Sequence, residues 1–250
     1  EITENVKYSD NIKNIVITAD KIIYHKNDEK IFTIGNSKII EENNNISANE
    51  LEYDKNLNTF KAKKNAEIHD YSKDTKIYAD EISYIKDEEK IYTKGKTRAL
   101  VQKKYKFNSS DIYYFRNDED IFSENKTSIK DDSGNIYKLD SFSYNITEGL
   151  LKGEKIEVLA KVEENKIDRY FFEDGFFNFK EKNHLAKKTK INIHKEVFGD
   201  KNNDPRIYSS SSLSDQSKTV FNNAIFTSCK FNDDCPPWSL KAEKITHDKI

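Results

Sequence analysis

The residue types that most often carry out chemistry in proteins do not cluster in this sequence. Its five histidines, at positions 25, 69, 184, 194 and 247, include no HExxH or comparable ligand pair. We therefore expect them on the surface and predict no metal site. There is also no glycine-rich phosphate loop, no nucleophile elbow and no cysteine–histidine pair with a third member. The sequence thus predicts a protein that is not an enzyme and that needs no cofactor.

Acidic or amide residues recur at nearly even spacing, and we call them anchors. They are separated by 29, 31, 31 and 29 residues, and they are Asp20, Asn49, Asp80, Asp111 and Asp140. A general acid and base belong to one site, whereas these residues recur in every unit. We expect them to make turn or bulge hydrogen bonds. An alternative hypothesis is an enzyme that acts on polysaccharides, which would need carboxylates that converge in one cleft.

The two cysteines, Cys229 and Cys235, are six residues apart. Because no second pair accompanies them, a structural zinc site is not expected. In an oxidising compartment a disulfide is favoured over free thiols, either between these two or with cysteines outside the sequence. The sequence does not choose among those pairings.

The composition points to an ordered chain in spite of its polarity. Charged residues make up 34% and the mean hydropathy is −0.89, values that alone would suggest disorder. The 14 tyrosines and 15 phenylalanines, however, recur at regular spacing. A net charge of −2 predicts no nucleic-acid partner. No apolar run reaches the ~18 residues of a membrane-spanning helix, and the absence of Met suggests a processed chain or a fragment.

The anchors belong to a sequence repeat, as in Ile17-Thr-Ala-Asp20-Lys-Ile22-Ile-Tyr24. Positions two, four and eleven residues after each anchor are apolar or aromatic in all five copies, and mostly polar residues alternate with them. Such period-two alternation is typical of half-buried strands. We predict that the interior is lined by Ile22, Tyr24, Ile31, Leu51, Tyr53, Phe60, Ile82, Tyr84, Ile91, Phe115, Phe122 and Phe142. From the pattern alone, that interior is either a plain core or an apolar trough for acyl chains.

The alternation changes phase at each anchor. Ile17 and Ala19 precede Asp20 at odd offsets, whereas Ile22 and Tyr24 follow it at even offsets. A straight strand cannot place both sets on one face, but a β-bulge or a corner at the Ala-Asp pair would do so and would bend the strand. We therefore predict an all-β fold, a curved antiparallel β-jellyroll or sandwich of stacked hairpin repeats of ~30 residues.

Four segments follow from this pattern. We expect an N-terminal lead-in over 1–16, the jellyroll repeats over 17–195, a polar loop over 196–222 and the last jellyroll strands over 223–250. In the last segment Ala242-Glu243 restarts the repeat. The exposed N-terminal unit, 17–40, is the predicted edge for a partner strand.

Several motifs together resemble a known family. They are the Ala-Asp-x-Ile-x-Tyr hairpins, Phe226-Thr-Ser-Cys229, Cys235-Pro-Pro-Trp238, and Ala242-Glu243 followed by His247-Asp248. The chain resembles the N-terminal periplasmic region of the LptD family of lipopolysaccharide-assembly outer-membrane proteins. The repeats alone resemble the wider OstA-like group, which includes LptA and LptC.

The resemblance implies a jellyroll that faces the periplasm at the cell outer membrane. It would accept lipopolysaccharide from an LptA-like periplasmic protein by edge-strand addition. It would then guide the lipid A acyl chains along its interior towards a C-terminal β-barrel, which works with an LptE-like lipoprotein. Cys229 matches the family cysteine of the Thr-Ser-Cys motif, which forms a disulfide with the barrel region, and Cys235 has no assigned partner. The alternatives are a structural or adhesive β-solenoid with a fully packed core and a soluble LptA/LptC-like bridge protein.

Overall fold

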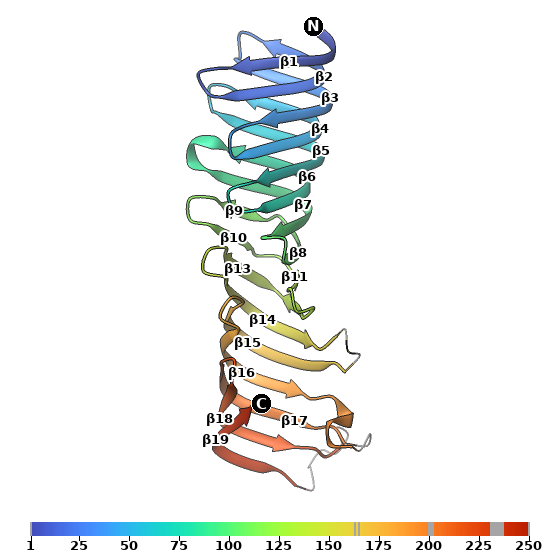
Figure 1. The fold of residues 1–250 in the computed structure, drawn as a ribbon, viewed down its shortest axis with the longest axis vertical. Helices are drawn as coiled ribbons and strands as arrows, with labels where there is room; N and C mark the ends of the chain where they lie inside the picture. The colour runs from blue at the N-terminus through green and yellow to red at the C-terminus, as the bar shows by residue number, and fades with distance from the viewer. Residues whose placement is uncertain (1, 163, 165, 200–202, 231–237, 250) are drawn as a thin grey trace. The chain divides into compact units, whose positions relative to one another are not determined.

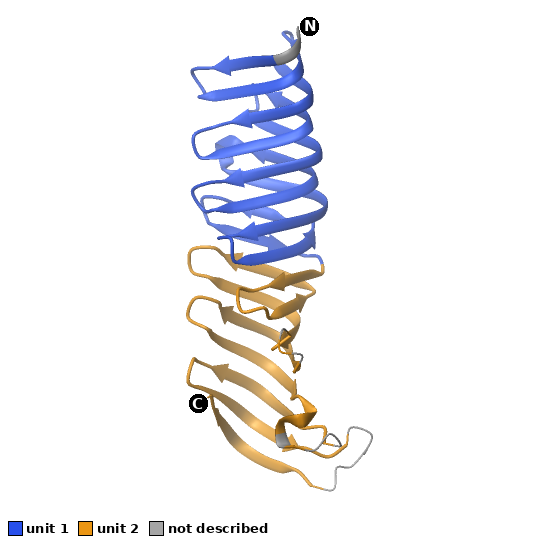
Figure 2. Cartoon of the chain, turned by 45° about the vertical axis from the view of Figure 1, so that its right-hand side comes forward, with its two compact units in different colours: residues 1–125 blue, residues 126–250 orange. Residues whose placement is uncertain are grey.

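The structure, a computed structural model, describes residues 2–162, 164, 166–199, 203–230 and 238–249. The chain divides into two compact units, residues 1–125 and 126–250, each of which is described by itself (Figure 2). Both are built from antiparallel β-strands joined mostly by short turns (Figure 1). The predicted all-β antiparallel fold is therefore confirmed. Among the described residues, no helix has the length and apolar character needed to cross a membrane.

Unit 1 is a ladder of paired strands. They are β1 (Ile2–Asp10), β2 (Ile15–His25), β3 (Lys30–Ile40), β4 (Asn44–Asp54), β5 (Thr59–Asp70), β6 (Thr75–Ile85), β7 (Lys90–Val101), β8 (Tyr105–Ser110), β9 (Tyr113–Phe115) and β10 (Asp120–Ser123), with the 3₁₀ turn η1 (Lys86–Glu88) before β7. Each strand from β1 to β7 pairs with the next one along the chain. β9 pairs with the first residues of β7 and with β10.

The long strands of unit 1 are irregular at one place each. The pairing of β2 with β3 shifts between Thr18 and Lys21, and the following four strand pairs shift at equivalent places. At one shift Gly35 and Asn36 have φ angles of 76° and 44°. The Asn36 side-chain amide donates to Asp20 Oδ2 at 3.0 Å. The strands are thus irregular where the Ala-Asp pair was predicted to bend them, but the extra residue is on the partner strand, where Gly35, Asn36 and Ser37 face Ala19 and Asp20.

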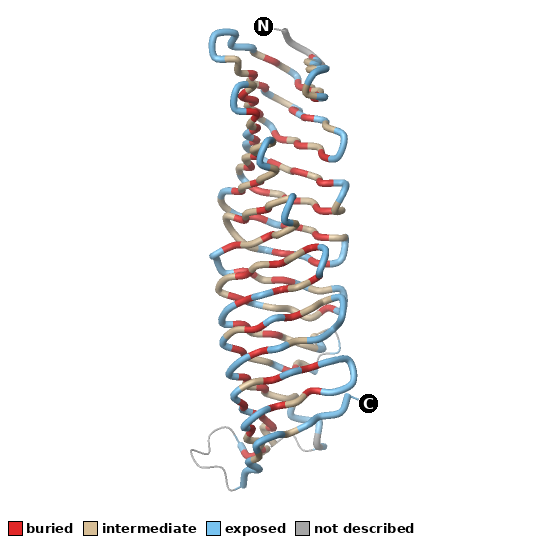
Figure 3. The backbone as a smooth tube through the Cα atoms, turned by 90° about the vertical axis from the view of Figure 1, so that its left-hand side faces the viewer, coloured by how far each residue is buried: buried red, intermediate tan, exposed pale blue. Residues whose placement is uncertain are grey.

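The bulge turns both halves of a strand towards the interior. In β4, Ile46 and Ala48 are buried before the bulge, and Leu51 and Tyr53 are buried after it. Buried and more exposed residues alternate in this way along the strands (Figure 3). Each strand therefore contributes to two facing walls. Wall A is formed by the strand halves that carry Ile31, Tyr53 and the residues equivalent to them on other strands, and wall B is formed by the other halves.

Unit 2 repeats the plan with shorter strands at its start. The strands are β11 (Thr127–Lys130), β12 (Ile136–Leu139), β13 (Ser141–Asn145), β14 (Leu150–Ala160), β15 (Asp168–Asn178), β16 (Asn183–Asn192), β17 (Arg206–Ser214), β18 (Lys218–Thr227) and β19 (Leu240–Asp248), with the 3₁₀ turn η2 (Lys195–Phe198) after β16. β12 and β13 both pair with β14, and from β14 to β19 each strand pairs with the next.

Two of the predicted segments contain strands that the sequence pattern did not reveal. Residues 196–222, predicted to be a polar loop, include β17 and the first half of β18. Inward residues there carry hydroxyl groups that hydrogen-bond to one another, as Thr189 Oγ1 donates to Ser212 Oγ at 2.8 Å. The sequence of this strand therefore lacks the alternation of apolar and polar residues that marks the other strands. Residues 1–16, predicted to be a lead-in, include β1, which pairs with β2.

Candidate functional site

The interior of unit 1 is a tight stack of side chains. One inward row on wall A follows the register from strand to strand, and its members are Ile31, Tyr53, Phe60, Tyr84, Ile91, Tyr114 and Ile121. All seven are at most 1% exposed. The Phe60 ring lies 4.5 Å from that of Tyr53 and 5.9 Å from that of Tyr84, stacked on both. This row resembles the core of an ordinary β-sandwich.

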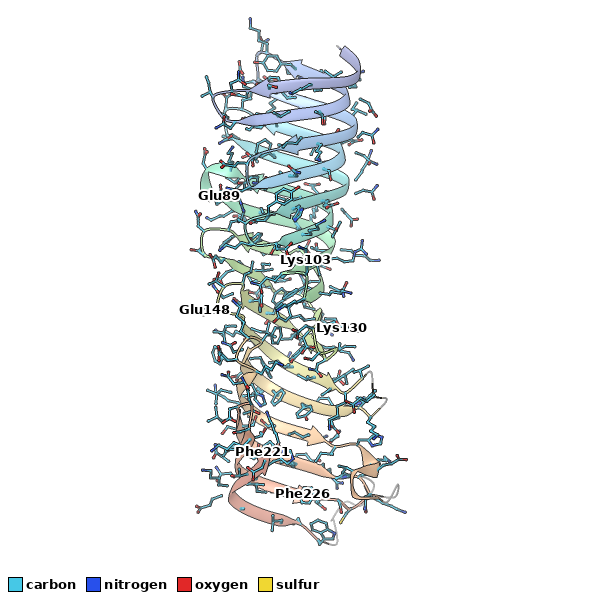
Figure 4. The ribbon with its side chains drawn as sticks, in the orientation of Figure 1. Glu89, Lys103, Lys130, Glu148, Phe221 and Phe226 are labelled. Atoms are coloured by element: carbon cyan, nitrogen blue, oxygen red, sulfur yellow. The ribbon has the colours of Figure 1, made fainter. Side chains whose placement is uncertain are left out.

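Two tyrosines of this row, Tyr84 and Tyr114, end in a buried polar network. Tyr114 donates to Asp70 Oδ2 at 2.8 Å, and Arg116 Nε donates to the same oxygen at 2.9 Å. Arg116 also contacts the Tyr84 hydroxyl and Glu89, which lies in the turn before β7 (Figure 4). Burial alone would raise the pKa of Asp70, but the hydrogen bonds and charge of Arg116 lower it. Burial raises the pKa of Tyr84 and Tyr114.

Turns from opposite strand ends meet along one side of unit 1, which we call the seam. Straight strands of about 11 residues would hold their ends roughly 36 Å apart. Yet Glu41, after β3, pairs with Lys86, before β7, at 2.5 Å. Lys73, after β5, likewise pairs with Glu119, after β9. Together with the Asp70–Arg116 network, these ion pairs join the two walls.

Nine of the twelve residues predicted to line the interior do point inward. They are Ile22, Ile31, Leu51, Tyr53, Phe60, Ile82, Tyr84, Ile91 and Phe142, each at most 9% exposed. Tyr24 is a correction: it shares the inner face with Ile31, its partner in the register, but is 45% exposed. The reason is that the pairing of β1 with β2 extends only to Ile22, so among the described residues of β1 none lies beside Tyr24.

Phe115 and Phe122 are the second correction, since both lie on the outer face. Ile112, Tyr114 and Ile121 are buried in their place, none of them measurably exposed. Asp111 is the predicted fourth anchor, but the register places Ser109 level with Ala79, since both pair with Thr97. The residue equivalent to the anchor Asp80 is therefore Ser110. The outward aromatics form their own cluster, with Phe122 5.0 Å from Tyr113 and 5.1 Å from Phe115.

Unit 2 differs because a partly open cavity of about 270 Å³, lined in part by aromatic rings, lies between its walls. Phe177 and His184 line it from wall A, and Val158 and Tyr170 line it from wall B. Phe172, Phe177 and His184 form a mutual cluster, with ring centroids 5.3 to 5.5 Å apart. The size is near the lower end for small-molecule sites, and the predominantly apolar lining is typical of them.

Aromatic contacts join the two walls at the mouth of this cavity. The Tyr137 ring on β12 lies 5.8 Å from Phe177 and 5.0 Å from Phe179 in the turn after β15. The rim is charged, with Lys182 and Lys249 on one side and Asp131 on the other. The site is therefore an apolar pocket with a polar entrance, which suits an amphipathic ligand.

The titratable groups inside the cavity are held neutral. Burial, with a smaller contribution from the charge of Lys249, lowers the pKa of His184 to about 4. Burial raises the pKa of Tyr170 to about 12. His184 thus lies inside the fold, contrary to the expectation that every histidine is at the surface. The sequence signal for this site was the aromatic density of residues 170–179, which the repeat pattern did not explain.

The anchors do not converge. Asp20 lies at one bulge beside Gly35, and Asp80 lies at another beside Gly95. In the described part of the chain, no group of three or more His, Cys, Asp or Glu residues is placed to hold a metal ion. The seam does contain a polar cavity of about 440 Å³, but lysine and arginine side chains line it together with the carboxylates.

Of the two cysteines, Cys229 is buried and carries a free thiol among the described residues. Its Sγ lies 3.6 Å from the carbonyl oxygen of Trp238, and Thr227 Oγ1 donates to that carbonyl at 2.8 Å. The Trp238 ring lies 5.7 Å from Phe226, which is on β18 (Figure 4). Cys235 lies outside the described residues, so the pairing remains a prediction.

The chain is similar to proteins of known structure but not to a known family. No family model and no curated protein matches the chain. Among solved structures, LptH from Pseudomonas aeruginosa, described as the LptA-homologous periplasmic component of the lipopolysaccharide transport device, matches with a TM-score of 0.39 and 16% identity. The match covers 43% of this chain and 80% of LptH. A likeness of this degree does not by itself indicate a shared function.

Proposed function

We propose that the chain carries an amphipathic lipid, lipopolysaccharide, by accepting its acyl chains between the two walls of the jellyroll. The observation that carries the proposal is the apolar cavity of unit 2, with Tyr170, Phe172 and Phe177 in its lining. Each methylene buried there would contribute about 0.8 kcal/mol. No bond is made or broken in such a role, in keeping with anchors that do not converge.

The environment of the lining supports an uncharged ligand tail. A protonated histidine would oppose the entry of hydrocarbon, since a charge in an apolar site is costly. The pKa of His184, near 4, keeps this ring neutral at any pH above that value. Lys182 and Lys249 at the rim leave the charged part of an amphiphile near solvent.

The finer assignment is an LptD-type role at the outer membrane, with this part facing the periplasm. Under it, an LptA-like protein adds a strand to an edge of the jellyroll. The candidate edge is β1 rather than residues 17–40, because β2 is paired on both sides by β1 and β3. The LptE-like lipoprotein and the β-barrel belong to the same assignment. A soluble LptA/LptC-like bridge protein fits the cavity equally well.

The test is site-specific photo-crosslinking in the intact chain. A benzophenone amino acid at Phe177, which faces the cavity, is expected to capture lipopolysaccharide. The matched control is the same substitution at Phe176, the neighbouring aromatic residue, which is 42% exposed on the outer face. Equal capture at the two positions would contradict an interior path. Capture at Tyr53 but not at Glu52 would show that the path includes unit 1.

The packed core of unit 1 favours a second candidate, a structural β-solenoid. Its inward row is at most 1% exposed, and ion pairs close the seam over it. Under this alternative the cavity of unit 2 is a packing defect and takes no lipid. Absence of crosslinks at both Phe177 and Tyr53, with lipopolysaccharide present in excess, would favour the structural role.

A further inference from the structure

One outer face of unit 2 carries a continuous row of exposed apolar side chains. Phe176 on β15, Leu185 on β16 and Leu213 on β17 are 42%, 52% and 55% exposed. They are direct partners in the register, and Val220 on β18 continues the row. Single exposed apolar residues are ordinary, but a contiguous set of them marks an interaction surface.

Polar residues flank this apolar row on the side nearer the bulge. Along that flanking row the charge changes from acidic to basic, and the members in strand order are Glu154, Asp174, Lys187, Ser211, Asn222 and Lys244. The acidic end is on β14 and β15, and a basic residue stands at the other end on β19. The face is therefore an apolar strip beside a strip of graded charge.

The outer face of unit 1 is built differently. Glu52 is directly opposite Lys61, and Glu50 is opposite Lys63, so neighbouring strands present charge pairs to the solvent. Ile34 is 50% exposed there, but its partners in the register are Lys21 and Glu50. An isolated apolar residue among charges is what a solvated sheet face normally shows.

We propose that the apolar row of unit 2 is a docking face for a second copy of this chain. The two copies would be related by a two-fold axis that runs parallel to the strands and passes between β16 and β17. This axis places the two sheet faces against each other with their strands in opposite order. Leu185 then faces Leu213 of the second copy, and Phe176 faces its Val220. In the flanking row the same operation sets Glu154 against Lys244.

The remaining positions agree with this arrangement. Asp174 faces Asn222 of the second copy and Lys187 faces its Ser211, so no like charges oppose each other. A two-fold contact must be complementary to itself, and a row with an acidic and a basic end meets that requirement. Because the apolar row is only four strands wide, the contact is small, and we expect a dimer that dissociates at micromolar concentrations.

Analytical ultracentrifugation of the whole chain over a concentration series tests the proposal. The wild type is expected to shift reversibly from monomer to dimer. Leu185→Lys and Leu213→Lys should each raise the dissociation constant about tenfold or more, because each puts a charge in the apolar strip. Ile34→Lys, the matched control on unit 1, should leave it unchanged. A wild type that stays monomeric overturns the proposal, even if Leu185 is then found to mediate binding to lipid vesicles.

Charge reversal tests the geometry without touching the apolar row. Glu154→Lys and Lys244→Glu should each weaken the dimer, and the double variant should recover most of the loss. Both side chains are exposed, so the fold is expected to tolerate either change, and circular dichroism checks that it does. A double variant no tighter than the single variants overturns the two-fold arrangement.

Discussion

Units 1 and 2 use the same bent hairpin but enclose different interiors. In unit 1 the wall A row reads Ile31, Tyr53, Phe60 and Tyr84, and ion pairs join the walls at the seam. In unit 2 the corresponding row includes Phe177 and then His184, Ser214 and Thr219. Smaller and more polar side chains on the later strands leave space that the aromatic rings do not fill. The backbone plan thus permits either a solid stack or a container.

The contacts that join the two walls also differ between the units. Charged groups join the walls of unit 1, and burial makes those groups costly to leave unpaired. Aromatic rings join the walls of unit 2, as in the contact of Tyr137 with Phe179. Aromatic rings can slide past one another with little loss of interaction free energy, whereas breaking a buried ion pair costs several kcal/mol. We therefore expect unit 1 to resist separation of its walls and unit 2 to permit it.

The largest expected effect comes from removing the central cation of unit 1. Arg116→Met leaves the carboxylate of Asp70, 2% exposed, without its charge partner. The free energy of unfolding should fall by about 3–5 kcal/mol. Hydrogen exchange measured by mass spectrometry should show the loss in residues 1–125 and little change in 126–250.

Two further variants sharpen this prediction. Asp70→Asn combined with Arg116→Met removes the unpaired charge and should recover part of the stability. Arg98→Met is the matched control, because Arg98 lies over the Tyr78 ring at 5.6 Å on the outer face. Its loss should cost less than about 1 kcal/mol. A similar cost for the two single arginine variants would mean that the seam is not held by buried charge.

Enlarging one side chain should separate a packed interior from a hollow one. Phe60→Trp adds volume to a stack between Tyr53 and Tyr84, and overpacking of this kind costs about 1–3 kcal/mol. Phe177→Trp adds volume beside a cavity of about 270 Å³ and should be nearly neutral. Chemical denaturation of each variant measures the difference. Equal destabilisation by the two substitutions would argue that the cavity is closed to larger side chains.

Much of unit 1 could be predicted from the sequence because its repeat is strict. The phase change at Asp20 placed the bulge, and Tyr53 and Tyr84 were correctly predicted to point inward. The prediction failed where apolar residues occupy both phases, as in Tyr113-Tyr114-Phe115 and Ile121-Phe122. With both faces aromatic, composition does not say which face is buried, and the register of β9 with β7 decides it.

The cavity could not be predicted from the alternation. A pattern of inward residues identifies a face, but the space between two faces depends on side-chain volumes from strands far apart in the sequence. Tyr137 and Phe179, for example, are in contact although they are 42 positions apart in the sequence. The serine-rich strand β17 was missed for a related reason, since its inward hydroxyls bond one another instead of packing apolar surface.

A pH titration should affect unit 2 more than unit 1, because burial lowers the pKa of His69 in unit 1 less strongly than that of His184. The pKa of His184 is lowered from 6.5 to about 4, so the fold favours the neutral ring. The free energy of unfolding is therefore unaffected by this group above pH 6.5. It falls as the pH drops from 6.5 towards 4, because the unfolded chain binds the proton more tightly than the folded one. At pH 5 the loss should be at most about 2 kcal/mol, and hydrogen exchange should place it in unit 2. His184→Phe should remove this part of the pH dependence, whereas His25→Gln, at an exposed site in unit 1, should retain it.

The smallest expected effect compares two glycines with nearly equal φ, Gly35 in unit 1 and Gly199 in unit 2. Their φ angles are 76° and 77°, so alanine meets the same backbone penalty at both. A Cβ on Gly35 would lie 2.3 Å from Asp20 Oδ2, whereas a Cβ on Gly199 meets nothing within 4 Å. Gly35→Ala should therefore cost about 1–2 kcal/mol and Gly199→Ala only about 1 kcal/mol, as measured by thermal unfolding.

Replacing Asp20 tests the cause of that difference. Asp20→Ala combined with Gly35→Ala removes Oδ2 and Cγ of Asp20, the two atoms nearest to the new Cβ, and leaves Cβ of residue 20 at 3.1 Å, so most of the cost beyond the backbone penalty should disappear. The bulge is what allows one strand to serve both walls, and a small, specific cost here would show that its geometry depends on contact between the anchor and the glycine. If Gly35→Ala and Gly199→Ala cost the same, the anchor adjusts freely, and backbone conformation alone accounts for the bend.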